Sequence, residues 1–401
     1  MRILQIISGL DIGRAHGGAE RFGLELACWL TRQGGSQVEL CAFWQHDTPA
    51  EQFWLQKLRD SGVPVFFAAT WPGQTTLRAY LQALRHLRRR FPHGSLDLAH
   101  SHFQLGTIAA LYLKGSKSAC RALRTTHITQ EWGIGWQSAL ARLAFTNGLF
   151  PLFLDAETGV SQAVVDRLAR RPLARLARKT PRLVYNAIPL EEFEEQLNHA
   201  GGWEEPAGTA GKEPVTNASS PVHRIGSIGR VTTQKDYETL VQAAARVLAE
   251  VPGAFFQVIG EGELRPDLET LAQQMGISHS FQFLGPRDDV ASFLKSLDLF
   301  VLPSRWEGLP TVVIESMVAG VPVIATDIPG TRELIDESRS GWLVPPGDPQ
   351  ALGQAIIQAV EQRSRLPEMG RAARKTAEQR ADWKVNFPQL ERALEIAMNS
   401  V

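Results

Sequence analysis

The chain has 401 residues, more than one hydrophobic core usually accommodates, so we expect two domains of about 200 residues each. Its 44% hydrophobic and 21% charged residues are ordinary for a globular cytosolic protein, and no apolar run reaches the ~18 residues of a membrane-spanning helix. The formal net charge is zero, but residues 1–200 carry 23 Lys and Arg against 16 Asp and Glu, whereas residues 201–401 carry 19 against 26.

The cysteines and the start of the chain bear on its compartment. Cys28, Cys41 and Cys120 show neither a disulfide pattern nor a metal-ligand spacing. The run MRILQIISGL carries one charge and meets Asp11, so we predict a buried first strand rather than a signal peptide. These features together predict a cytoplasmic protein.

Short apolar runs alternate with helical patterns along both halves of the chain, which is typical of parallel α/β sheets with crossover helices. In the first half, the predicted strands cover residues 2–7, 37–41, 98–101 and 121–125. The predicted helices of this half cover residues 19–32, 76–90, 106–113, 138–153 and 163–170.

A segment with almost no aliphatic residues separates the two halves. Residues 200–221 are rich in Gly, Ala, Pro, Ser and Glu, as in a linker or a surface insert. The second half resumes with the strand RIGSIGR, and its further predicted strands cover residues 254–259, 281–284, 299–302, 321–325 and 342–344. The helices between them are predicted at 237–250, 267–275, 311–319 and 349–362. Two such domains are expected to bind ligands in a cleft at the carboxyl ends of their strands.

The clearest chemistry lies in the segment PSRWEGLPTVVIE, which follows a buried strand. Gly308 permits close backbone approach, and Pro310 suits the first turn of a helix that begins near Thr311. Such a helix N-terminus presents unpaired N–H groups and can hold an anion such as a diphosphate. Glu307 and Glu315 would repel that anion if they faced it, so we predict that they accept hydrogen bonds from flanking sugar and ribose hydroxyls. A capped helix with a surface glutamate is the alternative.

A second pattern supplies positive charge. Gly229 and Arg230, followed by Lys235, lie at the first strand-to-helix turn of the second half. An arginine can place two N–H groups on phosphate oxygens and a lysine adds a point charge, so the pair suits a diphosphate leaving group. The alternative is a solvated lysine at the start of a helix.

Two glycine patterns follow predicted strands. Gly260 and Gly262 form a Gly-x-Gly turn, but the third glycine of a dinucleotide-binding loop is missing, which weakens the case for an NAD-dependent dehydrogenase. Gly17 and Gly18 open the first helix of the chain, where they either let a phosphate or sugar approach the backbone or form a flexible turn.

Together these motifs resemble those of the retaining family 4 glycosyltransferases (glycosyltransferase group 1), which have the GT-B fold. The resemblance implies two Rossmann-like, doubly wound parallel-sheet domains facing across a cleft, with a C-terminal helix that crosses back to the first domain. It places the N-terminal, acceptor-side domain at residues 1–187 with 384–401, the crossover and flexible insert at 188–221, and the nucleotide-sugar-binding domain at 222–383. It is thinnest between residues 40 and 95.

The resemblance implies roles for residues of the second domain. Glu307 is expected to contact the donor sugar and Glu315 the nucleotide ribose, while Arg230 and Lys235 neutralise the departing diphosphate. The remaining residues that it places around the donor are Gly229, Gly260, Gly262, Arg287 beside the base, Gly308, Leu309, Pro310 and Thr311. Pro310 has no N–H to give to the phosphates.

In the first domain, Gly17 and Gly18 resemble the turn that closes onto the donor. His127 resembles a histidine near the donor sugar, whereas His100 and His102 resemble a strand-end pair on the acceptor side. The segment VYNAIPLEEF resembles the interdomain crossover, with Ala187 in place of the usual glycine.

The implied activity is that of a hexosyltransferase. We expect transfer from a nucleotide diphosphate sugar, with a UDP-sugar favoured and GDP-mannose as second choice, to a glycan or lipid-linked acceptor in polysaccharide or glycolipid synthesis. The resemblance implies a front-face substitution, in which the leaving phosphate helps to deprotonate the acceptor. We expect no cofactor and no metal, since two cations and a helix terminus already meet the diphosphate, and no nucleic-acid partner.

The basic first half also carries two arginine clusters. One comprises Arg85, Arg88, Arg89 and Arg90, and the other comprises Arg167, Arg170, Arg171, Arg175 and Arg178 with interleaved leucines. Such a surface suits peripheral contact with an anionic membrane and a lipid-linked acceptor, with a solvated helix face as the alternative.

Two other functions remain open at this point. A nucleotide-sugar 2-epimerase of the same fold needs catalytic carboxylates in the first domain, and the sequence identifies none. A non-catalytic sugar-nucleotide-binding protein has no need to keep Arg230, Lys235, Glu307 and Glu315 together.

Overall fold

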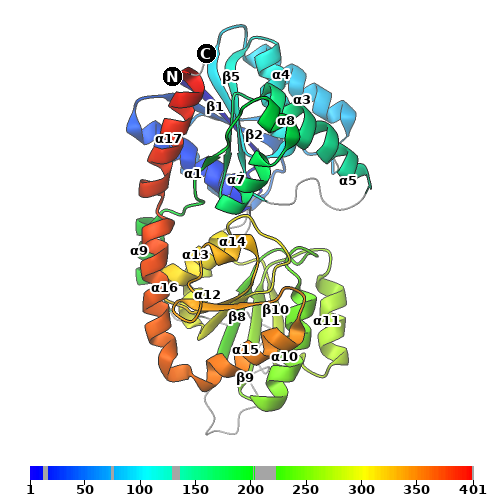
Figure 1. Ribbon diagram of the computed structural model, residues 1–401, viewed down its shortest axis with the longest axis vertical. Helices are drawn as coiled ribbons and strands as arrows, with labels where there is room; N and C mark the ends of the chain where they lie inside the picture. Colours follow the sequence, from blue (N-terminus) through cyan, green and yellow to red (C-terminus); the bar gives the residue numbers. More distant parts are fainter. Residues whose placement is uncertain (12–16, 74–75, 129–135, 202, 204–222, 400–401) are drawn as a thin grey trace. The chain divides into compact units, whose positions relative to one another are not determined.

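The computed structural model describes residues 1–11, 17–73, 76–128, 136–201, 203 and 223–399 (Figure 1). This described part separates into two compact units. Unit 1 holds the residues up to Asn186 together with those from Lys384 onward, and unit 2 holds the residues from Ala187 to Trp383. The boundaries implied by the sequence, after residue 187 and before residue 384, lie beside these two positions.

Within the described residues, unit 1 contains a seven-stranded parallel sheet in the order β3-β2-β1-β4-β5-β6-β7. Its strands are β1 (Arg2–Gly9), β2 (Gln37–Gln45), β3 (Val65–Thr70), β4 (Leu96–Ser101), β5 (Ala119–Thr126), β6 (Ala156–Gly159) and β7 (Arg182–Leu183). Ile6 of β1 lies beside Cys41 of β2 and Ser101 of β4. The strand order reverses between β1 and β4. The loops after these two strands therefore flank the switch point, where such sheets bind ligands.

Helices connect the strands of unit 1. They are α1 (Gly18–Gln33), α2 (Pro49–Asp60), α3 (Leu77–Arg90), α4 (Gln104–Gly115), α5 (Trp136–Ala141), a π-helical stretch (Arg142–Leu149), α6 (Phe150–Phe153), α7 (Gln162–Ala169) and α8 (Pro172–Leu176). Their ends follow from local sequence: the Thr48 and Thr76 hydroxyls accept N-terminal N–H groups of α2 and α3, and α1 ends at Gly34 with φ of 73°.

The C-terminal helix α17 (Trp383–Asn399) packs in unit 1, where Figure 1 shows it in red beside α1 in blue. Phe387 of α17 meets Phe22 and Trp29 of α1 edge-on, with ring centroids 5.2 and 5.8 Å apart. Such edge-to-face pairs add to the burial of the rings, so these contacts fasten the end of the chain to its first helix.

Unit 2 contains, among its described residues, a six-stranded parallel sheet in the order β10-β9-β8-β11-β12-β13. Its strands are β8 (His223–Ile228), β9 (Ala254–Ile259), β10 (Phe281–Gly285), β11 (Leu299–Leu302), β12 (Val323–Thr326) and β13 (Gly341–Val344). Ile225 of β8 pairs with Phe256 of β9 and Leu299 of β11. Strand β9 is buried over its whole length because helices cover both faces of the sheet, which explains its nearly continuous apolar sequence.

The helices of unit 2 are α9 (Leu190–His199), α10 (Tyr237–Glu250), α11 (Arg265–Gln274), α12 (Val290–Ser296), α13 (Thr311–Val318), α14 (Pro329–Arg332), α15 (Pro349–Glu361), a 3-10 turn (Arg363–Arg365) and α16 (Leu366–Arg380). The strand order reverses between β8 and β11. The loops after these two strands therefore lie at the switch point of this sheet.

The two parallel sheets confirm the predicted α/β architecture of two Rossmann-like domains. The sequence analysis did not predict α2, β3, β6, α8, β7, α9, α12, α14 or α16. It was also wrong to predict one uninterrupted helix at 138–153, because Arg142–Leu149 adopts π-helical bonding between α5 and α6. Side-chain periodicity does not distinguish a π-helical stretch from the α-helices that flank it.

Two further predictions concern the linker and membrane-spanning helices. Most of the linker predicted at 200–221 lies outside the described residues, which leave out 202 and 204–222. None of the helices in the described ranges is both long enough and apolar enough to cross a lipid bilayer.

Candidate functional site

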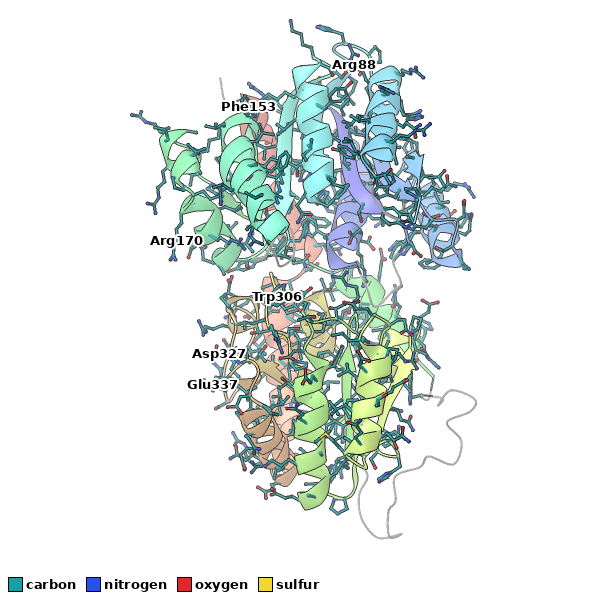
Figure 2. The ribbon with its side chains drawn as sticks, turned by 90° about the vertical axis from the view of Figure 1, so that its right-hand side faces the viewer. Arg88, Phe153, Arg170, Trp306, Asp327 and Glu337 are labelled. Carbon is teal, nitrogen blue, oxygen red and sulfur yellow. The ribbon has the colours of Figure 1, made fainter. Side chains whose placement is uncertain are left out.

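The switch point of unit 2 joins the loop after β8 to the loop after β11. The Arg305 backbone N–H donates to the Gln234 carbonyl at 2.8 Å, and Gln234 Nε2 donates to the Trp306 carbonyl at 3.0 Å (Trp306 is labelled in Figure 2). Arg305 also forms an ion pair with Asp236 at 3.0 Å. These contacts hold two segments that are about seventy residues apart in sequence as one surface.

An ion pair between Lys235 and Glu307 lies at the centre of that surface. Lys235 Nζ donates to Glu307 Oε1 at 2.7 Å, and the Ser304 hydroxyl donates to the same oxygen at 2.8 Å. Gln234 Nε2 lies 3.4 Å from Glu307 Oε2. The Lys235 and Glu307 side chains are only 14% and 9% exposed, so the pair is largely desolvated and removal of either charge would leave the other buried without it.

Gly229 makes room for this lysine. A Cβ atom at position 229 would lie 2.9 Å from Lys235 Cε and 3.0 Å from the Tyr237 hydroxyl oxygen. The Lys235 side chain therefore crosses directly over the backbone of Gly229 on its way to Glu307. Arg230, the next residue, is exposed and forms no ion pair with any residue in the described part.

Helix α13 begins immediately after the glutamate. Pro310 precedes its first residue, Thr311, and the first turn leaves N–H groups without partners inside the helix. Glu315, on the next turn, is 2% exposed. The N-terminus of α13 is thus a candidate anion site beside the pair of Lys235 and Glu307.

Close backbone packing fixes the loop in front of α13. A Cβ atom at position 330 would lie 2.4 Å from the Gly308 carbonyl oxygen, so this loop rests against the start of α14. Leu309 is buried beneath it. The Thr326 hydroxyl at the end of β12 donates to the Ser304 carbonyl. The predicted turn at Gly308 and Leu309 is therefore held in place by packing against α14 and by the hydrogen bond between Thr326 and Ser304.

The Gly-x-Gly turn after β9 packs against the loop after β8. A Cβ atom at position 262 would lie 2.3 Å from the Val231 carbonyl oxygen, and the Gly260 N–H donates to the Gly285 carbonyl at 2.9 Å. Gly262 is thus required for contact between two loops. The sequence analysis assigned both glycines to the lining of a nucleotide pocket, and this packing role was missed.

Arg287, predicted beside a nucleotide base, lies in the loop after β10. Its guanidinium group forms a two-pronged ion pair with Asp289 and lies 4.8 Å from the ring centroid of Trp203. The hydrogen bonds that Arg287 donates to Asp289 raise the pKa of the guanidinium group, so its charge is held in place. Arginine stacked on an aromatic ring presents a flat, rigid edge.

Unit 1 gathers three histidines at the ends of β4 and β5. His102 Nδ1 lies 3.2 Å from His127 Nε2, and His102 Nε2 lies 2.9 Å from Gln5 Oε1 of β1. His100 Nε2 lies 2.8 Å from the Thr125 hydroxyl. The sequence analysis assigned His127 to the donor and His102 to the acceptor, whereas the structure joins them in one hydrogen-bonded chain.

Burial keeps these histidines neutral. Desolvation lowers the pKa of His102 to about 3 and lowers those of His100 and His127 well below the usual value, with their neighbouring charges as smaller causes. With Gln5 Oε1 as acceptor, His102 carries its proton on Nε2 and accepts a hydrogen bond from His127 Nε2. His127 Nδ1, for which no described residue is a partner, is then an acceptor for a hydroxyl group.

The first turn of α1 is similarly constrained. Gly17 precedes α1 with φ of 77°, a left-handed conformation that favours glycine, and its carbonyl accepts the Arg21 N–H at 2.8 Å. Gly18 is the first residue of the helix. The Ser8 hydroxyl at the end of β1 donates to Glu20 at 2.6 Å. This glutamate of the Gly-Gly-Ala-Glu motif is therefore engaged within unit 1.

Comparison with known proteins identifies the family. Residues 16–192 match the family described as Glycosyltransferase Family 4, and residues 213–376 match the family described as Glycosyl transferases group 1. The chain belongs to the group 1 glycosyltransferases. The predicted resemblance is thereby confirmed.

Curated relatives of this group 1 glycosyltransferase include enzymes of bacterial surface polysaccharides. It is 36% identical over 158 residues to the lipopolysaccharide core biosynthesis glycosyltransferase LpsE of Rhizobium meliloti, covering 39% of this chain and 45% of that protein. It is 28% identical over 315 residues to an Escherichia coli UDP-Gal:alpha-D-GlcNAc-diphosphoundecaprenol alpha-1,3-galactosyltransferase, covering 75% and 76%. The chain spans less than half the length of several curated relatives, among them LpsE.

A solved structure shares the fold of this glycosyltransferase. The Anabaena protein HepE, in complex with UDP and glucose, superposes with a TM-score of 0.74 at 18% identity, over 98% of this chain and 99% of that one. At this level of identity the likeness concerns the fold. It confirms the expected GT-B class.

Sequence reasoning missed several partners in this glycosyltransferase. It predicted Lys235 and Glu307 as separate contacts of a ligand, and neither their ion pair nor the support from Ser304 and Gln234 has a sequence signal. It also counted Arg171 in a basic surface, which is wrong because Arg171 is buried in an ion pair with Glu157. In the described part, no group of three or more His, Cys, Asp or Glu side chains is placed to hold a metal ion.

Proposed function

We propose that the protein is a retaining hexosyltransferase that moves a hexose from a nucleotide diphosphate sugar to a glycan or lipid-linked acceptor in polysaccharide or glycolipid synthesis. A UDP-sugar is the favoured donor and GDP-mannose the second choice. The observation that carries the proposal is the pair of Lys235 and Glu307, desolvated beside the N-terminus of α13 at the switch point of unit 2. The UDP and glucose bound to Anabaena HepE support the choice of donor.

The lysine and the helix terminus suit the diphosphate of such a donor. A lysine ammonium has three donors, and Glu307 uses one of them, so two remain for phosphate oxygens. Arg230, which is exposed, adds a second cation. As the bond between the sugar and the diphosphate breaks, its electron pair stays on the leaving oxygen, and these groups stabilise the charge that builds there.

The carboxylates contact hydroxyl groups in this mechanism. Glu307, fixed by Lys235 and Ser304, accepts a hydrogen bond from the donor sugar, and Glu315 accepts one from the ribose. The neutral His127 accepts a further hydroxyl on Nδ1. The acceptor oxygen attacks the anomeric carbon on the face from which the diphosphate leaves, and a leaving phosphate oxygen takes the acceptor proton.

No cofactor enters this mechanism, and no metal is proposed. The two cations and the helix terminus supply the charge stabilisation that a divalent ion would otherwise provide.

Peripheral contact with an anionic membrane is part of the proposal. Arg85 and Arg89 of α3 are exposed, although Arg90 is engaged by Glu39 and lies over the ring of Phe66.

A thermal-shift screen of UDP-, GDP- and ADP-sugars tests the donor. A ligand at about 100 times its dissociation constant stabilises the folded protein by ~2.7 kcal/mol, so one base should raise the melting temperature clearly above the others. Transfer of a labelled hexose, with retention of anomeric configuration seen by NMR, tests the reaction. Formation of a 2-epimer of the donor sugar without any acceptor would instead indicate an epimerase.

Liposome flotation tests the membrane contact. We expect binding to vesicles with acidic lipids at low salt, and weaker binding as the salt concentration rises. Absence of binding at low salt would remove the membrane from the proposal while leaving the transfer reaction in place.

A further inference from the structure

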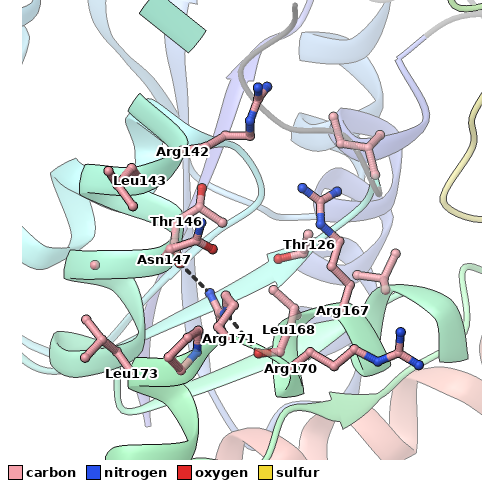
Figure 3. A pocket seen from close by; sticks show the side chains of 14 residues that line it. Thr126, Arg142, Leu143, Thr146, Asn147, Arg167, Leu168, Arg170, Arg171 and Leu173 are labelled. Carbon is pink, nitrogen blue, oxygen red and sulfur yellow. Dashed lines mark hydrogen bonds between the residues drawn. The ribbon is translucent and has the colours of Figure 1, made fainter. Parts of the chain in front are cut away.

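A cavity of about 530 Å³ lies within unit 1 between the π-helical stretch and helices α7 and α8 (Figure 3). Four arginines line it, namely Arg142, Arg167, Arg170 and Arg171. No acidic side chain occurs among the described residues of this lining. The proposed transfer mechanism uses none of these residues, so the concentration of positive charge needs its own explanation.

One of the arginines is part of the wall. Arg171 is buried in an ion pair with Glu157, and its guanidinium group also donates to the Thr146 and Leu168 carbonyls, both at 2.8 Å. Glu157 also lies 3.7 Å from the buried Arg124. A single carboxylate thus serves two buried guanidinium groups, so the wall of the cavity keeps a net positive charge.

Two other arginines that line the cavity keep their charge available. Arg167 and Arg170 form no hydrogen bond or ion pair with any residue that the structure describes. Figure 3 shows Arg167 reaching toward the side of the cavity where Arg142 lies, while Arg170 points away from it. Burial, followed by Arg142 and Arg171, lowers the pKa of Arg167, which reflects like charges crowded in a partly desolvated space.

A buried hydroxyl adds a second, independent signal. Thr126, at the end of β5, is 3% exposed and lines the cavity, and its Oγ1 has no hydrogen-bond partner in the described part of the chain. Figure 3 shows this oxygen directed into the cavity, between Arg167 and Arg171. A buried hydroxyl without a partner is unfavourable, and an anionic oxygen in the cavity would satisfy it.

The lining also includes apolar side chains. Leu143 and Leu173 lie at the cavity, and Leu143 is 66% exposed although it is one of the most hydrophobic residue types. An exposed leucine next to a cationic cavity suits a ligand that is both anionic and apolar. A free inorganic anion would use only the first of these features.

We propose that this cavity binds the phosphate or diphosphate end of an amphiphilic acceptor. Arg142 and Arg167 bind the phosphate oxygens, the Thr126 hydroxyl donates to one of them, and Leu143 and Leu173 contact the first part of the hydrocarbon chain. The inference rests on the proposed function, because transfer to a lipid-linked acceptor is what brings such a ligand to unit 1. It assigns the acceptor class as a polyprenyl-type phosphate or diphosphate.

Calorimetric titration of the full chain with farnesyl diphosphate, inorganic pyrophosphate and farnesol tests the site. We expect farnesyl diphosphate to bind at least about tenfold more tightly than pyrophosphate, since only the former also contacts the leucines, and farnesol not to bind. Arg167→Gln should weaken farnesyl diphosphate binding about tenfold or more, and Thr126→Val by a smaller factor. Equal binding of pyrophosphate and farnesyl diphosphate would overturn the assignment of an apolar chain.

Matched variants separate this site from general electrostatics. Arg78→Gln removes an exposed arginine of α3 outside the cavity and outside both arginine clusters, and should leave the affinity for farnesyl diphosphate unchanged, whereas Arg167→Lys should retain part of it. Melting temperatures of all variants report whether they fold. Unchanged affinity in a folded Arg167→Gln protein, or an equal loss in Arg78→Gln, would overturn the site.

The outcome is separable from that of the proposed function. Lys235→Met should abolish the nucleotide-sugar thermal shift but keep farnesyl diphosphate binding. Arg167→Gln should keep the nucleotide-sugar thermal shift but weaken farnesyl diphosphate binding. If nucleotide sugars bind and farnesyl diphosphate does not, the acceptor site fails alone. If farnesyl diphosphate binds and no nucleotide sugar does, the proposed transfer reaction fails and the anion site stands.

Discussion

The ion pair of Lys235 and Glu307 allows a sharp prediction about both stability and activity. Lys235→Met removes the ammonium but keeps an unbranched side chain that can still cross Gly229. Glu307 then remains buried without the ammonium, although Ser304 and Gln234 still lie beside its carboxylate. Breaking a buried pair costs ~3–5 kcal/mol of unfolding free energy, and the partial exposure of both side chains puts the expected loss near the lower value, about 3 kcal/mol.

The double variant Lys235→Met with Glu307→Gln isolates the electrostatic part. A neutral amide no longer needs the ammonium, so the double variant should recover about 2 kcal/mol of the loss seen in Lys235→Met alone. Urea denaturation followed by circular dichroism measures these free energies. Lys375→Met, on the exposed face of α16, is the matched control and should change stability by less than about 0.5 kcal/mol.

Activity should fall for a separate reason. Without the ammonium the departing diphosphate loses a preorganised donor, which corresponds to about 3 kcal/mol of transition-state stabilisation or a 10²–10³-fold lower turnover. Turnover is measured as nucleotide release from the preferred donor at a temperature at which the variant remains folded. A Lys235→Met protein with the stability of the parent would refute the buried pair, and one with near-parental turnover would refute the role of the lysine.

Three further predictions concern other parts of the molecule. Burial holds the pKa of His102 near 3 in the folded protein, against about 6.5 when unfolded, so the contribution of His102 to stability should be constant above pH 7 and fall below pH 6.5, by about 2 kcal/mol at pH 5. His102→Gln should remove this part of the pH dependence in urea titrations. Gly262→Ala forces a Cβ atom against the Val231 carbonyl and should cost about 1–3 kcal/mol, whereas Gly115→Ala meets open space and should not destabilise the fold in thermal melts. Donor turnover should persist in excess EDTA, and complete loss that Mg²⁺ or Mn²⁺ restores would contradict the metal-independent mechanism.

Much of the fold follows from local patterns that a single sequence displays. Strands β9 and β11 and helix α10 occur at the predicted residues, since each is a continuous apolar run or a long amphipathic pattern between turn residues. The elements that were missed carry weaker signals. In α9, only Leu190, Phe193 and Leu197 are buried among charged neighbours, and packing within unit 2 decides that this segment is helical.

In the candidate site, too, some features follow from the sequence and others only from the tertiary structure. The sequence by itself singled out the residues that we propose carry the chemistry, because Glu307, Glu315, Arg230 and Lys235 stand in recognisable turns before or within helices. Only the tertiary structure decided their contacts, because hydrogen bonds across about seventy residues join the loops after β8 and β11 and leave no periodic trace in the chain. The cationic cavity also depends on the tertiary structure, because the sequence does not show which of its arginines are buried in ion pairs and which line the cavity. Burial against Glu157 turns Arg171 into a structural residue and leaves Arg167 facing the cavity.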